Sequence, residues 1–251
     1  MIRTAIVTGG ARRIGAAIAR RLAAGGWRVV VHHCRSDVAA QGLAAVLPGA
    51  VALEQDLALP GAAAALLGAA RARLGGPIAA IVNNASLFEF DTPGAIDPAL
   101  IEAHVALNLT APALLAEALA AQDDLAEGAV VNLLDQKIVN LNPDFFAYSC
   151  TKVALAGATV MLDQALGPRV RVNAVAPGLT LPSLDQSEAE YQAVARRNLL
   201  ARPVRAEAVA DAVAYLLEAR AVRGQTLFVD CGQRFLPRRR DVMFATRGAD
   251  A

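Results

Sequence analysis

Short apolar runs alternate with longer segments of helical periodicity along the whole chain. Between the runs, apolar residues recur at helical spacing, as at Ile14, Ile18 and Leu22. Several runs are almost continuously apolar, which is typical of parallel strands covered by helices on both faces. The alternation predicts an α/β fold, a single-domain doubly wound parallel sheet of about seven strands over residues 1–251. The predicted strands are Thr4–Thr8, Arg28–His33, Val51–Gln55, Ile78–Asn83, Ala129–Leu134, Arg169–Val175 and Thr226–Asp230.

Two stretches depart from this alternation. Pro177–Pro203 follows a strand, is long, and includes an amphipathic patch that predicts a short helix at Glu188–Leu200. Long excursions after a strand's carboxyl end are often lids, so we interpret it as a substrate loop. The tail Arg234–Ala251 is interpreted as a loose or interface-docked terminus. Long apolar helices are predicted at Leu100–Ala121 and Ala147–Leu166.

Composition narrows the class of protein. The chain has 251 residues, 55% of them hydrophobic, and its 24 basic residues nearly balance 23 acidic ones. Such a composition excludes a disordered chain and argues against a nucleic-acid partner, which needs clustered positive charge. Cys34, Cys150 and Cys231 lie far apart, which argues against a disulfide framework or a metal site.

Membrane insertion and secretion are not expected either. Arginines interrupt the apolar stretch Gly61–Leu74, and polar residues interrupt Val105–Ala121, so neither provides the ~20 apolar residues of a spanning helix. The N-terminus starts with a strand pattern and lacks the charged and apolar regions of a signal peptide. We therefore expect a cytoplasmic protein.

A glycine-rich turn, Thr8–Gly15, follows the first strand and leads directly into a helical segment. Gly9 permits the tight turn, and Gly15 lets the helix approach the strand closely. The helix N-terminus then offers backbone N–H groups to a pyrophosphate. Because the turn lies in the first strand–helix unit, we interpret it as the phosphate loop of a Rossmann fold rather than a simple connection. Arg13 replaces the usual middle glycine and adds a guanidinium for the phosphates or a substrate.

The second strand ends in His32–Ser36, at the position that distinguishes NAD from NADP in such folds. NAD sites usually place an acidic residue here for the ribose 2′-hydroxyl, and the first acid is Asp37. Arg35 and Ser36 instead offer a cation and a hydroxyl suited to a 2′-phosphate. The sequence therefore predicts NADPH as the cofactor. The plainer alternative is a solvated loop arginine beside two packing histidines.

Polar residues also end the third and fourth strands. Asp56 is placed to accept from the adenine amino group, and Asn83-Asn84-Ala85 to line the adenosine cleft. Each would be an ordinary turn residue in isolation. Because open α/β sheets bind ligands at the carboxyl ends of their strands, we assign them to one cofactor site.

Tyr148 and Lys152 stand four residues apart after the fifth strand. On a helix they share one face, one turn apart. A nearby ammonium favours the phenolate and lowers the tyrosine pKa, so we expect Tyr148 to donate a proton near neutral pH. Solvated surface pairs at this spacing are common, but the position in a dinucleotide-binding fold favours catalysis.

In the order of these motifs the chain resembles the short-chain dehydrogenase/reductase family over nearly its whole length. The resemblance rests on the phosphate loop, Asn83-Asn84-Ala85, Asn108, Tyr148 with Lys152, and Pro177-Gly178. It implies that Tyr148 is the catalytic acid, that Lys152 binds the nicotinamide ribose, and that Asn108 holds a relay water. It also implies a homotetramer. The expected cofactor-binding residues are Gly9, Arg12, Arg13, Ile14, Gly15, His33, Arg35, Ser36, Asp56, Leu57, Asn84, Ala85, Ser86, Tyr148, Lys152, Pro177, Gly178 and Thr180.

Asp135 departs from the family's pattern. Most members carry a serine shortly before the catalytic tyrosine, where it donates to a substrate carbonyl; here Asp135 stands thirteen residues before Tyr148. An ionised carboxylate only accepts hydrogen bonds and repels the oxyanion that develops on a reduced ketone. It suits a substrate with several N–H donors, such as a 2-amino-4-oxo-pteridine. It can also relay a proton to a ring nitrogen through Tyr148.

This substitution resembles the pteridine reductase and dihydromonapterin reductase branch of the family. Arg13, His32–Ser36 and Asn83–Phe88 resemble that branch's phosphate loop, NADPH-selecting segment and Asn-Asn-Ala-Ser-x-Phe motif. By this resemblance the Phe88 ring sandwiches a pterin against nicotinamide, whereas a core or hinge role is the plainer interpretation. The expected substrate-binding residues are Arg13, Ser86, Phe88, Asp135 and Tyr148.

The leading hypothesis is NADPH-dependent reduction of a dihydropterin such as dihydromonapterin or dihydrobiopterin, or secondarily dihydrofolate, to the tetrahydro form. An alternative is an NADPH-dependent carbonyl or 3-oxoacyl thioester reductase that tolerates Asp135 as a protonated acid. A third, of another class, is a non-catalytic NADPH-binding sensor or scaffold. The presence of both Tyr148 and Lys152 disfavours it.

Overall fold

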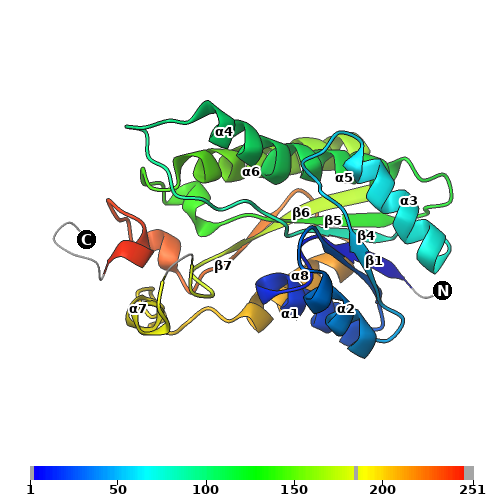
Figure 1. Ribbon diagram of the computed structural model, residues 1–251, viewed down its shortest axis with the longest axis horizontal. Helices are drawn as coiled ribbons and strands as arrows, with labels where there is room; N and C mark the ends of the chain where they lie inside the picture. The colour runs from blue at the N-terminus through cyan, green and yellow to red at the C-terminus, as the bar shows by residue number, and fades with distance from the viewer. Residues whose placement is uncertain (1–2, 184–185, 246–251) are drawn as a thin grey trace.

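Seven parallel strands form one sheet in the order β3-β2-β1-β4-β5-β6-β7 (Figure 1). The computed structural model describes residues 3–183 and 186–245. The predicted doubly wound parallel sheet is confirmed, and every strand ends within two residues of its predicted bounds. The strands are β1 (Thr4–Val7), β2 (Arg28–His33), β3 (Val51–Glu54), β4 (Ala80–Asn83), β5 (Gly128–Leu133), β6 (Val170–Pro177) and β7 (Thr226–Val229).

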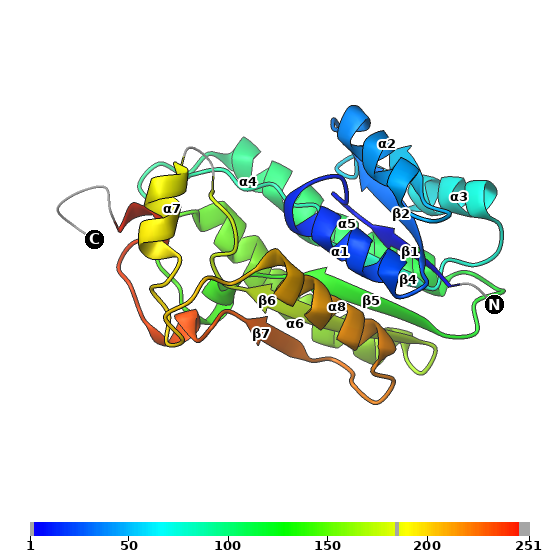
Figure 2. The same cartoon turned by 90° about the horizontal axis from the view of Figure 1, so that it is seen from below.

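Helices cover both faces of this sheet (Figures 1 and 2). Alternate residues of one strand enter different cores: Val7 joins the core under the first helical layer, and Ile6 joins the core on the opposite face. Both faces of the sheet are therefore buried, which explains why the strands appear in the sequence as continuous apolar runs. One layer holds α1 (Arg13–Ala24), α2 (Asp37–Val46) and α8 (Ala206–Glu218); the other holds α3 (Ala62–Leu74), α4 (Pro98–Val105), α5 (Ala111–Ala120) and α6 (Phe146–Leu166).

A π-helical turn, Ala106–Thr110, joins α4 to α5. The three segments make one stretch, Pro98–Ala120, close to the single helix predicted at Leu100–Ala121. Single π turns inside α-helices often mark functional sites. Here the turn carries Asn108, whose side chain is fully buried.

By length and composition alone, the stretch Pro98–Ala120 is sufficient to cross a membrane. The expectation stated for Gly61–Leu74 and Val105–Ala121 did not cover this stretch, because the helix begins at Pro98, ahead of Val105. A helix in a layered core passes the same test, and α5 packs against α3 and α6.

The excursion after β6 contains one helix, α7 (Glu188–Val194), among its described residues. Ser187 and Glu190 form a capping box at its start. The helix is shorter than the predicted Glu188–Leu200, since the Asn198 side chain donates to the Ala195 and Arg202 carbonyls and turns the chain.

The tail folds back onto the chain's own surface. After β7 it forms two short 3₁₀ turns, η3 (Gln233–Phe235) and η4 (Val242–Phe244), and the second lies against α7 (Figure 2). Met243 is 1% exposed. The prediction of a loose terminus is therefore wrong for residues 234–245, and docking at an interface stays a prediction. Residues 246–251 lie outside the described ranges.

Candidate active site

The predicted phosphate loop lies at the carboxyl end of β1 and leads into α1. Gly15 has no room for a side chain, because a Cβ there would collide with the Gly9 carbonyl oxygen. Arg13 has φ +54°, the left-handed region that favours glycine and explains why a glycine is usual at this position. Helix α1 starts without a side-chain cap among the described residues and has no acid in its first turn. Its first N–H groups are therefore suited to an anion.

His32 supports this loop from behind. Its Nδ1 accepts from the Gly9 N–H (3.1 Å), so its Nε2 carries the proton and donates to the Gln55 carbonyl (2.8 Å). Burial lowers the pKa of His32 to about 4. The neutral ring is a packing histidine that also fixes the loop. His33 is equally buried and lies 3.6 Å from the Asp37 carboxylate.

Residues that end β4 are tied to the same loop. The Asn84 side-chain amide donates to the carbonyls of Thr8 (2.9 Å) and Gly9 (3.1 Å). The Thr8 hydroxyl accepts from the backbone N–H groups of Asn84 and Ala85. The order of strands reverses between β1 and β4, where doubly wound sheets bind dinucleotides.

The predicted adenosine-side residues gather at the ends of β2 and β3. These strands pair in parallel with His33 opposite Glu54, which brings Arg35 and Ser36 toward Asp56. Arg35 is exposed, and the Ser36 hydroxyl makes no capping bond to α2 among the described residues. Asp56 accepts from the Ala58 N–H (3.0 Å). Leu57 is buried, and Arg12 is exposed at the start of α1.

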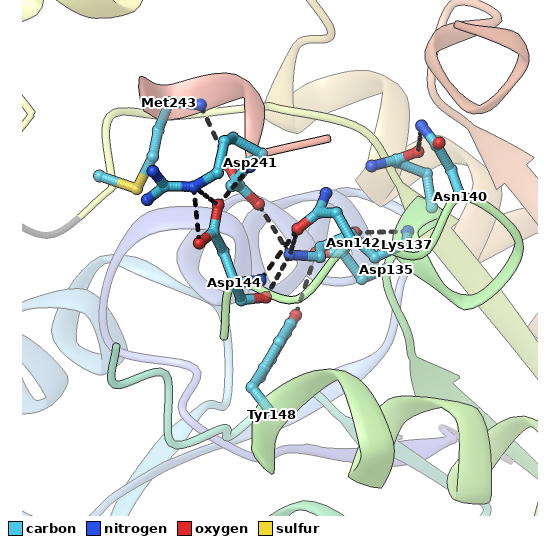
Figure 3. A network of polar contacts seen from close by, with 10 residues as sticks. Asp135, Lys137, Asn140, Asn142, Asp144, Tyr148, Asp241 and Met243 are labelled. Atoms are coloured by element: carbon cyan, nitrogen blue, oxygen red, sulfur yellow. Dashed lines mark hydrogen bonds and ion pairs between the residues drawn. The ribbon is translucent and has the colours of Figure 1, made fainter. Parts of the chain in front are cut away.

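The three predicted reacting groups lie together. Asp135 follows β5, and its Oδ1 accepts from the Lys137 N–H (2.8 Å) at the start of the 3₁₀ turn η2 (Gln136–Val139). Its Oδ2 accepts from the Tyr148 hydroxyl (3.1 Å) (Figure 3). The Lys152 ammonium donates to the Leu133 carbonyl (2.7 Å) and lies 5.5 Å from the centroid of the Tyr148 ring.

Burial dominates the electrostatics of this group. It raises the pKa of Asp135 and lowers the pKa of Lys152 to about 8. The prediction that Lys152 lowers the pKa of Tyr148 is wrong for this structure. Burial, followed by the Asp135 carboxylate, raises the pKa of Tyr148 well above its usual value. Tyr148 is therefore held as the protonated acid that already donates to Asp135.

A cavity of about 170 Å³ opens beside these groups. Phe88 forms part of its wall, stacked on Phe145 at 4.2 Å between ring centroids and edge-on to Tyr148 at 4.7 Å. Arg13 also lines it, and its guanidinium donates to the Pro182 carbonyl (2.7 Å) in the loop after β6. Four further residues predicted at the cofactor site also line it: Ile14, Pro177, Gly178 and Thr180. A larger cavity of about 830 Å³, between α8 and β7, contains none of the predicted site residues.

Asn108 reaches the site through a loop rather than directly. Its Oδ1 accepts from the Leu87 N–H (2.8 Å) and the Ser86 hydroxyl (3.2 Å). Its amide donates to the Leu87 carbonyl and the Thr151 hydroxyl. The side chain thus holds the loop that carries Phe88; the predicted relay water stays a prediction.

Two further residues lie at the site that the sequence pattern did not indicate, Lys137 and Phe145. Lys137 is 3% exposed, and Phe145 is fully buried with φ +56° immediately before α6. Composition offered one clue to Lys137: the chain has only two lysines, Lys137 and Lys152, against 22 arginines. The structure adds that both lysines are buried at the site, which the composition does not show.

A doubly wound sheet with this glycine loop and a buried Tyr-Lys pair defines a dinucleotide-dependent oxidoreductase. The family model for short chain dehydrogenases matches residues 3–193. The chain belongs to the short-chain dehydrogenase family. Cys231 has a left-handed backbone (φ +52°), the conformation that favours glycine.

Three similar proteins carry informative names. FolM alternative dihydrofolate reductase 1 from Brucella canis, solved in complex with NADP, is 40% identical, with a TM-score of 0.88 over 93% of this chain and 94% of that one. A dihydromonapterin reductase of Klebsiella pneumoniae is 28% identical over 92% of this chain and 96% of its own length. The angucycline C-6 ketoreductase LanV, with bound NADP, is 27% identical, with a TM-score of 0.85 over 93% and 96%.

Proposed function

We propose that this protein reduces a dihydropterin to its tetrahydro form with NADPH. The single observation that carries the proposal is the contact between the Asp135 carboxylate and the Tyr148 hydroxyl (3.1 Å) beside the cavity. A carboxylate in this place accepts from N–H donors, which a pterin has and a simple ketone lacks. The names of the Brucella and Klebsiella proteins support the same substrate class.

The residues fit the cofactor. A cradle without side chains at Gly9 and Gly15, and an uncapped α1 N-terminus, suit a pyrophosphate. Exposed Arg35 and the Ser36 hydroxyl, which makes no capping bond to α2 among the described residues, suit a 2′-phosphate. Asp56 and Leu57 would flank the adenine, and Pro177, Gly178 and Thr180 the nicotinamide. When bound, NADPH supplies the hydride.

The chain's own residues manage the proton. Tyr148 is kept protonated by burial and by Asp135, so its hydroxyl holds the proton for the substrate's ring nitrogen. Asp135 accepts from pterin N–H groups and, after turnover, takes up a proton from solvent and relays it to the Tyr148 oxygen. Lys152, fixed on the Leu133 carbonyl, would bind the nicotinamide ribose and favour reprotonation of Tyr148 from the solvent side.

Substrate orientation would come from Phe88, Arg13 and Ser86. Phe88 is backed by Phe145, so its ring is a rigid stacking surface for a planar substrate. Arg13 donates to the Pro182 carbonyl in the predicted substrate loop, so its guanidinium would connect the predicted phosphate loop to the side of the cavity where a pterin would lie.

A carbonyl reductase is the second candidate. The raised pKa of Asp135 favours its protonated form, which can donate to a carbonyl oxygen as a serine would. The ketoreductase LanV has a similar chain and fold.

Steady-state NADPH oxidation distinguishes the candidates. We expect turnover with dihydromonapterin or dihydrobiopterin, slower turnover with dihydrofolate, and none above background with an acetoacetyl thioester. Tyr148→Phe is the matched control, because it removes only the hydroxyl. Turnover of the thioester without any dihydropterin would reject the proposal in favour of the carbonyl reductase.

We further propose a homotetramer in the cytoplasm. Helix α6 presents exposed apolar side chains, Val153, Val160 and Met161, the last 64% exposed. Burial of such a patch between copies would remove it from water. Light scattering of the purified protein at several concentrations measures the assembly.

A further inference from the structure

The tail of the chain lies beside the reacting groups. Asp241 and Val242 line the same cavity as Asp135, Tyr148 and Phe88, although more than 90 residues separate them from each of these in the sequence. Val242 and Met243 are buried in this position. The substrate cavity therefore has a wall that comes from the segment Leu236–Phe244, hereafter the C-terminal wall.

A buried cation anchors the C-terminal wall (Figure 3). The Lys137 ammonium donates to Asn142 Oδ1 (3.0 Å), to the Asp144 carbonyl (2.8 Å) and to Asp241 Oδ2 (3.0 Å), which uses its three protons. Lys137 and Asp241 side chains are 3% and 13% exposed. A buried charge whose partner is removed is strongly destabilised, so Lys137 needs the C-terminal wall in place.

A second buried carboxylate clamps the same segment. Asp144, 1% exposed, accepts from the Arg240 guanidinium (2.8 Å) and from the Asp241 N–H (2.7 Å). Two successive residues of the wall are thus bonded to the loop that follows η2. Such charge-assisted bonds fix position as well as supply energy.

Two routes connect the wall to the reacting centre. Lys137 carries the first: its ammonium holds Asp241, while its own N–H donates to Asp135 Oδ1 (2.8 Å). Aromatic stacking carries the second, from Phe244 to Phe145 (6.1 Å between centroids) and from Phe145 to Phe88 (4.2 Å). Asp135, the hydrogen-bond acceptor of the site, therefore contacts Lys137, and Phe88, its stacking surface, contacts Phe145. Both Lys137 and Phe145 are in turn contacted by the tail.

We propose that Asp241 and Lys137 are positioning residues, which hold Asp135 in register with Tyr148 only while the C-terminal wall is docked. The inference deepens the proposed function and rests on it for its kinetic readout. The charged and titratable groups that face Asp135 are Tyr148 and Lys152 from α6, Lys137 from η2 and Asp241 from the wall. Lys137 lowers the pKa of Asp135 and Asp241 raises it, so the two partners act with opposite sign.

Because Lys137 and Asp241 shift the pKa of Asp135 in opposite directions, variants of the two residues test the coupling. The ¹³C NMR signal of the Asp135 carboxyl, assigned by its loss in Asp135→Asn, is titrated in the full chain without substrate. We expect Asp241→Asn to move the titration to lower pH and Lys137→Met to move it to higher pH, each by about one pH unit. The double variant should return close to wild type. Arg239→Gln, which removes an exposed charge from the same segment, is the matched control and should leave the titration in place.

The kinetic readout tests positioning. Asp241→Asn is expected to lower kcat for the dihydropterin by roughly tenfold and to leave the KM for NADPH within about twofold of wild type. Titrations that stay in place, or that move in one direction in both variants, would overturn the inference, as would a kcat for Asp241→Asn equal to that of Arg239→Gln. If Lys137→Met does not fold, Asp241→Asn alone must still move the titration down. A wild type without dihydropterin turnover would reject the proposed function, and the NMR titration would still decide the coupling.

Discussion

Replacement of Asp135 by asparagine removes one charge from the reacting centre and almost nothing else. The amide has the shape of the carboxylate and keeps one acceptor oxygen for the Lys137 N–H, which now lies 2.8 Å from Oδ1. Its NH₂ group then faces the Tyr148 hydroxyl, which donates to Oδ2 at 3.1 Å. Tyr148 must reverse its role and accept, so its proton no longer points along the relay.

The expected cost to catalysis follows from this loss of proton transfer. Positioned general acids and bases contribute about 10²–10⁴-fold, so we expect kcat for a dihydropterin to fall by about 10²–10³-fold, or about 3–4 kcal/mol in the barrier. Stability should change little, within about 1–2 kcal/mol, since relief of carboxylate desolvation offsets the lost charge-assisted bond. The pKa of Tyr148 should fall, because the Asp135 carboxylate helps to raise it.

Single-turnover NADPH oxidation measures this step directly, with thermal unfolding and NADPH affinity as checks of the fold. Asp135→Ser is the matched control, because it restores the donor that most family members carry and should favour a ketone substrate over a dihydropterin. An Asp135→Asn enzyme that keeps dihydropterin turnover within about threefold of wild type would refute the reasoning.

Three further predictions concern the cofactor and the buried lysine. Gly15→Ala should weaken NADPH binding at least tenfold in a fluorescence titration, about 1.4 kcal/mol or more, because the added Cβ meets the Gly9 carbonyl. Unchanged affinity would contradict the assignment of the Gly9–Gly15 loop to the pyrophosphate. Arg35→Ala should raise the KM for NADPH by roughly tenfold or more and leave that for NADH within about twofold, since it removes one charge-assisted bond to the 2′-phosphate; an equal loss for both cofactors would count against that contact. The Lys152 pKa falls from 10.5 to about 8 on folding, so the unfolded chain binds more protons between these values and stability rises with pH there. From pH 8 to pH 10 the free energy of unfolding of wild type should therefore rise relative to Lys152→Met by up to about 2 kcal/mol, as denaturant titrations can measure; a flat difference would exclude a neutralised lysine.

The sequence predicted the sheet because the physics of its strands is local. A strand buried on both faces must be apolar at every position, so its limits are visible in a single window of residues. The placement of Tyr148, Asp135 and Phe88 at one cavity followed from the same rule, since each lies beyond the carboxyl end of a parallel strand.

The sequence could not predict contacts that depend on tertiary packing. Lys137 and Asp241 meet across 104 positions, and no periodicity connects them. The pKa of Tyr148 was predicted in the wrong direction, because the spacing to Lys152 is visible in the sequence and the burial of the hydroxyl is not. The tail was interpreted as loose or interface-docked for the same reason: its apolar residues find partners, such as Phe145, only in the folded chain.

The π turn at Ala106–Thr110 makes helix length as critical as helix composition. A π turn holds one residue more than an α turn, and here that residue brings Asn108 to the loop at Ser86 and Leu87. Deletion of a single residue from the turn would let the stretch continue as a regular α-helix, with α4 and α5 close to their present register, because four residues of an α-helix turn about as far as five residues of a π turn. The bulge that brings Asn108 to the loop would then be lost, although the helices around it kept their packing. A deletion of one residue here would therefore remove a contact of the site without disturbing the fold that surrounds it.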